Sequence, residues 1–148
     1  MNEIDSRSEQ DNTGVTIAVS DHTKDHLSSF CGYSGAPFSE MIDAFRFAVS
    51  IGLAQKGGDV PDISATSGTT MYNMGSFDRD GVFRSVIQAV APEACKTHTI
   101  TRLIRAYGEY GVAVMVEQCE NDPSSLDIHD SLESIQSDID QVNEEVDV

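Results

Sequence analysis

The stretch VTIAVSDHTKDHLSSF, residues 15–30, constrains the fold more than any other part of this chain. Its first six residues alternate large apolar with small residues, the pattern of a short strand that buries one face. Ser20 follows directly and is a preferred helix N-cap, and Asp21 suits the positive end of a helix. We therefore expect a strand that leads straight into a helix, and Gly32 is expected to end that helix.

A second helix is predicted from Pro37 to the Gly57–Gly58 pair. Its apolar residues lie on too many sides for a single surface stripe, so we expect this helix to be central in the fold. Residues 59–75 are rich in Gly, Ser, Thr, Pro and Asp, which predicts an irregular connector.

Two more helices are predicted after the connector. The first runs from Ser76 to Ala91 and ends at Pro92. Four of its residues form the predicted core-facing stripe: Phe83, Val86, Ile87 and Val90. The second is capped by Thr97 or Thr99, and its Gly108 and Gly111 lie on one side, where another backbone can approach closely.

The charge of the chain is unevenly distributed. The formal net charge is -16, of which residues 1–14 carry -3 and residues 119–148 carry -10, with no Lys or Arg in the latter segment. The middle, 15–118, is close to balanced, with eleven acids and eight bases. Screening over roughly 10 Å lets a basic patch there act independently of a distant acidic tail. Such acidity is also typical of proteins from salt-loving hosts, and the sequence leaves that alternative open.

The acidic C-terminal segment has a heptad pattern. Its apolar residues are spaced alternately four and three apart, as in a coiled-coil seam: Ile128, Leu132, Ile135, Ile139, Val142 and Val146. We expect either a helix that binds a partner or the body through this edge, or a disordered acidic tail. The fold class is thus mainly α, with a short N-terminal β-strand and about four helices. The domain organisation is a disordered acidic arm (1–14), a helical core domain (15–118) and the acidic tail (119–148).

No pattern in the sequence indicates catalysis, a cofactor or a metal. The common hydrolase, metalloprotease and nucleotide-binding motifs are absent. His22 and His26 are four apart on the first helix, but the other two histidines are far away in sequence, so we expect no metal site. The three cysteines form no CxxC pair. No apolar run reaches the roughly 20 residues of a membrane span, and residues 1–12 do not resemble a secretory signal, so we expect a cytoplasmic protein.

Two features point to nucleic acid. The exposed face of the predicted strand carries Thr16 and Ser20, which suit weak contacts in a DNA groove but no bidentate base reading. A basic set suits contacts to phosphate and consists of Arg79, Arg84, Lys96, Arg102 and Arg105. Ordinary surface salt bridges to Asp80, Glu93 and Glu109 are the alternative for these side chains.

The segments VSDHTKDHLSSF and SEMIDAFRFAVSIGLA resemble ribbon-helix-helix proteins, intertwined dimers in which two strands pair across the dimer axis. With TTMYNMGSFDRDG, FRSVIQAV and TITRLIRAYGEYGV, the pattern over about 15–116 is similar to the DndE-type accessory proteins of DNA phosphorothioation systems. That resemblance implies a helical, oligomeric, non-enzymatic subunit that binds duplex or nicked DNA. Within AFRFA, Arg46 matches the arginine of the family's second helix, and we expect Arg46 to be structural and to pair with Asp43 one turn away. The family's lysine-rich character and the acidic tail do not match.

Three functions follow as expectations. The first is a non-catalytic, homo-oligomeric, DNA-associated subunit of a DNA modification or defence complex, which also binds other subunits of that complex. The second is a ribbon-helix-helix repressor or antitoxin whose C-terminal arm neutralises a toxin or partner. The third is an assembly adaptor that does not bind nucleic acid.

Overall fold

The computed structural model describes residues 16–64, 67–119 and 122–128. The fold is mainly helical with a two-stranded sheet at its N-terminal end, which confirms the predicted fold class. Among the described residues, no helix is both long and apolar enough to cross a membrane. The elements, in chain order, are β1 (Thr16–Val19), α2 (Asp21–Ser29), α3 (Met41–Lys56), β2 (Thr69–Asn73), α4 (Met74–Phe77), α5 (Val82–Val90), α6 (Pro92–Cys95), α7 (Ile100–Cys119) and a 3-10 turn, η2 (Pro123–Ser125).

The strand and the helix predicted from residues 15–30 are both present. Ile17 and Val19 of β1 are fully buried, and Thr16 is exposed, as the alternation predicted. The Ser20 hydroxyl accepts a hydrogen bond from the Thr23 N–H at 3.2 Å, which is an N-cap of α2. The helix ends before Gly32, whose φ of 82° is readily adopted only by glycine.

The partner of β1 differs from the expectation of a two-chain ribbon. β1 pairs antiparallel with β2 of the same chain, with Ile17 opposite Tyr72 and a register shift after Ile17. The connector 59–75 is therefore not irregular throughout, because its last part forms this second strand. Glycine, serine and threonine around β2 concealed it, since these residues are typical of turns.

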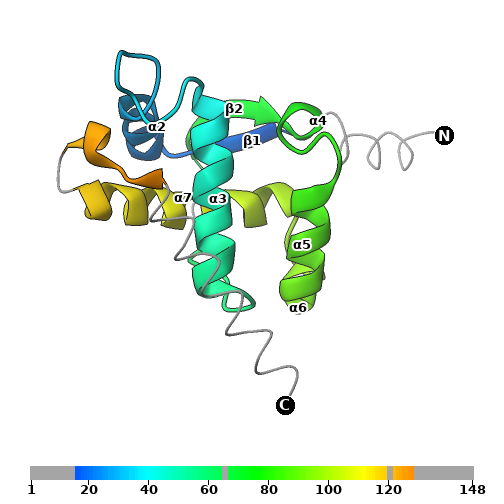
Figure 1. Ribbon diagram of the computed structural model, residues 1–148. Coiled ribbons are helices and arrows are strands. Elements are labelled where there is room, and N and C mark those ends of the chain that lie inside the picture. The colour runs from blue at the N-terminus through cyan, green and yellow to red at the C-terminus, as the bar shows by residue number, and fades with distance from the viewer. Residues whose placement is uncertain (1–15, 65–66, 120–121, 129–148) are drawn as a thin grey trace.

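Helices α3 and α7 cross at the centre of the fold, and their backbones touch (Figure 1). A Cβ atom added at Gly111 of α7 would lie 1.8 Å from the carbonyl oxygen of Ala48 in α3. On the other helix, a Cβ at Gly52 would lie 2.3 Å from the carbonyl oxygen of Tyr107. The close backbone approach predicted for Gly108 and Gly111 is thus confirmed at Gly111, whereas a Cβ at Gly108 would meet the Phe45 side chain. Only glycine at positions 52 and 111 lets the two helices pack at this distance.

The helix predicted from Ser76 to Ala91 is wrong as one element, because the chain turns between α4 and α5. Gly81 has a left-handed φ of 74° and precedes α5. The Asp78 carboxylate accepts hydrogen bonds from the N–H groups of Phe83 and Arg84, at 3.0 and 2.9 Å. Asp78 therefore caps a new helix instead of lying within the first turn of a longer one.

The predicted core-facing stripe of α5 is only partly correct. Ile87 is fully buried, and Phe83 is half-buried against the core. Val86 and Val90 are 38% and 37% exposed, and Val82 on the same side is 59% exposed. Because α5 is apolar over more than half its circumference, the sequence pattern overestimated the part that the core covers.

The core extends beyond residue 118, where the sequence placed the domain boundary. Cys119 and Leu126 are buried, and Ile128 packs partly against the core. The other five predicted seam residues lie outside the described residues, as does the N-terminal arm. A truncation that preserves the core must therefore end after Ile128.

Candidate anion-binding site at the start of α7

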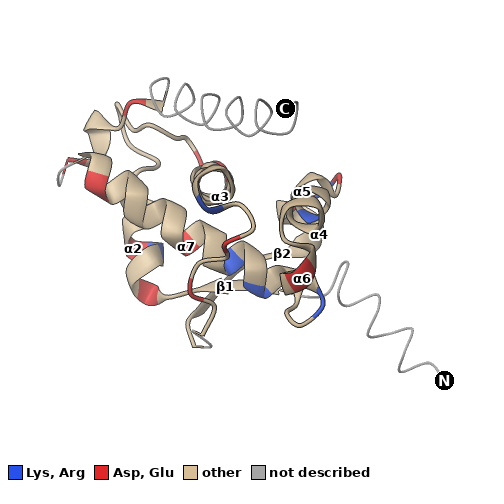
Figure 2. Ribbon diagram, turned by 90° about the horizontal axis from the view of Figure 1, so that it is seen from below, with Lys and Arg blue, Asp and Glu red and all other residues tan. Residues whose placement is uncertain are grey.

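The five predicted DNA-binding cations come from neighbouring parts of the fold. Arg79 lies in the turn between α4 and α5, Arg84 lies on α5, and Lys96 follows α6. Arg102 and Arg105 lie in the first two turns of α7. Figure 2 shows basic residues on α5 and at the beginning of α7, together with an acidic residue on α6, whereas the far end of α7 is acidic and α2 carries both charges.

Arg105 differs from the other four because it is buried, with 8% of its surface exposed. Its Nε donates to Glu109 Oε2 at 2.7 Å, and its Nη2 donates to the Ser67 carbonyl at 2.5 Å. The same Glu109 carboxylate accepts the backbone N–H of Ser20 at 3.0 Å. Arg105 and Glu109 thus connect α7 to the connector and to the start of α2. The expected phosphate contact of Arg105 does not fit this position, and we leave Arg105 out of the candidate site.

The two strand residues expected to contact DNA, Thr16 and Ser20, lie in different surroundings. Thr16 is exposed on β1 and lies opposite Asn73 of β2. The Ser20 hydroxyl is within hydrogen-bond distance of Thr23 and of Glu109. Because Ser20 serves as a cap beside a carboxylate, a phosphate contact at Ser20 is electrostatically unfavourable.

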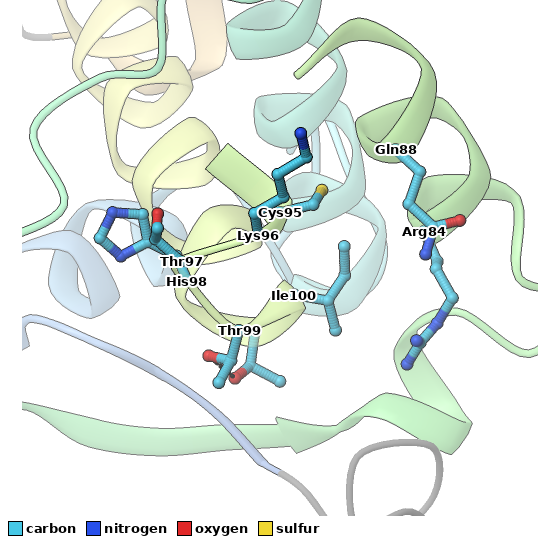
Figure 3. A pocket seen from close by; sticks show the side chains of 9 residues that line it. Arg84, Gln88, Cys95, Lys96, Thr97, His98, Thr99 and Ile100 are labelled. Carbon is cyan, nitrogen blue, oxygen red and sulfur yellow. Dashed lines mark hydrogen bonds between the residues drawn. The ribbon is translucent and has the colours of Figure 1, made fainter. Parts of the chain in front are cut away.

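A cavity of about 380 Å³ lies between α5, α6 and the start of α7 (Figure 3). Arg84 and Gln88 of α5 form one wall, and Lys96 and Ile100 lie across from them. The remaining lining residues belong to the segment that leads into α7: Cys95, Thr97, His98, Thr99 and Thr101. Two of the five predicted cations therefore line one cavity.

The start of α7 adds to the positive potential of this cavity. Thr99 caps the helix, since its hydroxyl accepts the Arg102 N–H at 3.3 Å. The first turn contains no acidic residue, and the last turn contains no basic one. A helix dipole favours acidic residues in the first turn and basic residues in the last turn, so α7 lacks both of the favourable charges. The N-terminal end of α7 therefore suits an external anion through its dipole, while the N–H groups of Arg102 and Leu103 already donate to Thr99.

Two exposed side chains of the basic set, Lys96 and Arg102, each make one contact to a neighbouring group of the protein. Lys96 Nζ lies 3.1 Å from Glu93 Oε2, and both side chains are largely exposed. Exposed pairs of this kind contribute about 0–1 kcal/mol, so Lys96 remains available to a phosphate. Arg102 is exposed and donates from Nη2 to the Ile63 carbonyl at 2.8 Å.

Arg79 belongs to a different opening with balanced charges. This opening has a volume of about 370 Å³ and contains Arg46 and Arg79 but also Asp78 and Asp80. Arg46 is occupied there, since its Nε donates to the Phe77 carbonyl at 3.1 Å and its Nη1 lies 3.3 Å from Asp43. The structural role expected for Arg46 is confirmed, and Arg79 is separate from the cavity.

The described residues contain no group of three or more His, Cys, Asp or Glu side chains placed to hold a metal. Burial raises the pKa of the Cys31 and Cys119 thiols, with a smaller effect from Asp43 on Cys31. A raised pKa keeps a thiol protonated and unreactive near neutral pH.

Sequence reasoning missed the segment Thr97–Thr101 as part of a site. The signal was present, because a short polar segment between a proline-initiated helix and a capped helix places hydroxyls beside a helix start. Gln88 had no such signal, because only the packing of α5 beside α7 places it at the cavity.

In comparisons with protein families, with curated proteins and with solved structures, no match to this chain was found.

Proposed function

We propose that this protein is a non-catalytic, DNA-associated accessory subunit of a DNA sulfur-modification or related defence complex. In this proposal it acts in the cytoplasm as a homo-oligomer together with other subunits of the complex. The observation that carries the proposal is the cavity at the start of α7, where Arg84 and Lys96 meet a helix terminus that has no acidic residue in its first turn. The resemblance of residues 15–116 to DndE-type proteins supports the same assignment.

The chemistry of the cavity suits the DNA backbone better than the bases. Arg and Lys side chains neutralise phosphate, and a helix N-terminus donates backbone N–H groups to it. The strand offers small side chains that read bases poorly, such as Thr16. We therefore expect binding that depends strongly on salt and weakly on sequence.

The repressor alternative loses support from the strand pairing. A ribbon-helix-helix protein reads DNA with strands from two chains, whereas β1 pairs here with β2 of its own chain. The adaptor alternative has one specific observation in its favour, namely the exposed valine side of α5 formed by Val82, Val86 and Val90. Exposed apolar side chains that lie together are typical of protein-protein contacts.

The test is a titration of fluorescent duplex DNA with the double variant Arg84→Glu/Lys96→Glu. Two phosphate contacts contribute about 1.8 to the slope of log K against log salt, so we expect the slope to fall by about that amount and the affinity to fall at least tenfold. The matched control is Lys24→Glu/Lys56→Glu, which makes the same change in net charge on α2 and α3. We expect this control to weaken binding much less.

A truncation after Ile128 completes the test. It removes seven acidic residues and no Lys or Arg. We expect it to bind DNA more tightly than the full chain at the same salt concentration, because a polyanion is repelled by the acidic segment. If neither the full chain nor the truncation binds DNA at about 50 mM salt, where electrostatic binding is strong, the proposal is wrong and the adaptor alternative stands.

A further inference from the structure

Two histidines on α2 face each other on the protein surface. His22 is exposed, and its Nε2 lies 3.0 Å from Nε2 of His26, one turn further along the helix. The ring centroids are 4.3 Å apart, and the rings are nearly perpendicular, at 83°. The two Nε2 atoms thus face each other across one turn of the helix, on its exposed side.

The distance between the two nitrogens is that of a hydrogen bond, and it also fits one coordination geometry without movement of either ring. Metal–imidazole bonds are about 2.1 Å long, so two ligands at 90° lie about 3.0 Å apart and two tetrahedral ligands about 3.4 Å apart. The observed 3.0 Å matches the 90° angle of square-planar or octahedral sites. Imidazole ligands in that geometry are typical of Cu²⁺ and Ni²⁺.

We propose that His22 and His26 form a surface binding site for Cu²⁺ or Ni²⁺, with water in the remaining coordination positions. Without metal, a neutral pair shares one proton in an Nε2–H···Nε2 hydrogen bond. When the metal binds, the donor ring changes its tautomer, so that its proton leaves Nε2 and its Nδ1 is protonated instead. Both Nε2 lone pairs are then available to the metal. Asp21 and Asp25 on the same helix make the surroundings favourable for a cation.

The sequence alone did not favour this site, because two histidines four apart on a polar helix face commonly have no ligand. The facing Nε2 atoms and their separation are the new observation. The site lies on α2, across the fold from the cavity beside α5 and α6 (Figure 1). It is therefore independent of the proposed DNA function, and either proposal can fail without the other.

The test is an isothermal titration of the full, untagged chain with NiCl₂, and separately with ZnCl₂. Ni²⁺ is preferred as the probe because it does not oxidise cysteine thiols. We expect one Ni²⁺ per chain, bound more tightly than Zn²⁺, because Zn²⁺ prefers tetrahedral sites. We expect His22→Ala and His26→Ala each to lower the Ni²⁺ affinity at least tenfold.

A matched variant tests the spacing rather than the number of histidines. Lys24→His/His26→Ala keeps two histidines on α2 but places them two residues apart, where side chains do not face each other. This variant should lose Ni²⁺ binding as His26→Ala does, whereas Lys24→Ala and His98→Ala should retain it. Unchanged Ni²⁺ affinity in His22→Ala, or tighter binding of Zn²⁺ than of Ni²⁺ by the wild type, would overturn the proposal.

Discussion

Replacing Gly111 by alanine tests whether contact between the α3 and α7 backbones is essential to the fold. At an ordinary helix position this substitution stabilises a protein by about 1 kcal/mol. Here the new Cβ would lie 1.8 Å from the Ala48 carbonyl oxygen, whereas ordinary contact begins near 3.4 Å. The helices would have to separate by about 1.6 Å, and a gap of about 1 Å already removes up to half of the dispersion energy of the contacts it opens. We expect a net loss of about 3 kcal/mol in the free energy of unfolding.

The measurement is urea denaturation followed by far-ultraviolet circular dichroism. Gly75→Ala is the matched control, because its nearest contact would be a side-chain atom, Asn73 Oδ1, at 3.4 Å. Gly108→Ala is expected to lie between the two, since its Cβ would meet the Phe45 ring, a side chain that can move more readily than a backbone. If Gly111→Ala is as stable as Gly75→Ala, the helices do not pack at this distance and the reasoning is refuted.

Two further predictions concern buried polar groups. Arg105→Met leaves the Glu109 carboxylate without its cation, so we expect a loss of about 2–3 kcal/mol in urea denaturation; a loss below 0.5 kcal/mol would contradict a structural role. Burial raises the pKa of Tyr107 to about 12, above the value near 10 of an unfolded tyrosine, so the unfolded state loses its proton first as the pH rises. The stabilisation from Tyr107, up to about 2–3 kcal/mol, is therefore present below pH 10 and is lost between about pH 10 and 12. Tyr107→Phe should lose less stability than the wild type over this range, and equal losses would show that Tyr107 ionises normally.

Within the candidate site, the sequence identified residue types but not their roles. In the sequence alone, nothing distinguishes the roles of the three basic residues Arg84, Lys96 and Arg105. Their surroundings differ because Arg105 points toward Glu109 and the Ser67 carbonyl, while Arg84 and Lys96 line the cavity. Which cation is buried depends on segments about 40 residues away, such as the connector, and no local pattern encodes that contact.

Local patterns did predict much of the fold, since the interactions behind them span only a few residues. The cap formed by Ser20 binds an N–H three residues away, and Thr99 caps α7 in the same way. Gly111 in α7 also showed in advance where another backbone approaches, because only an absent side chain allows such contact. The pairing of β1 with β2, by contrast, joins residues more than 50 positions apart, such as Ile17 and Tyr72. Hydrogen bonding, capping and periodicity within a segment are thus determined by the sequence itself. The choice of strand partner and the burial of a particular arginine were decided only when the whole chain packed, because these depend on which distant surfaces exclude water together.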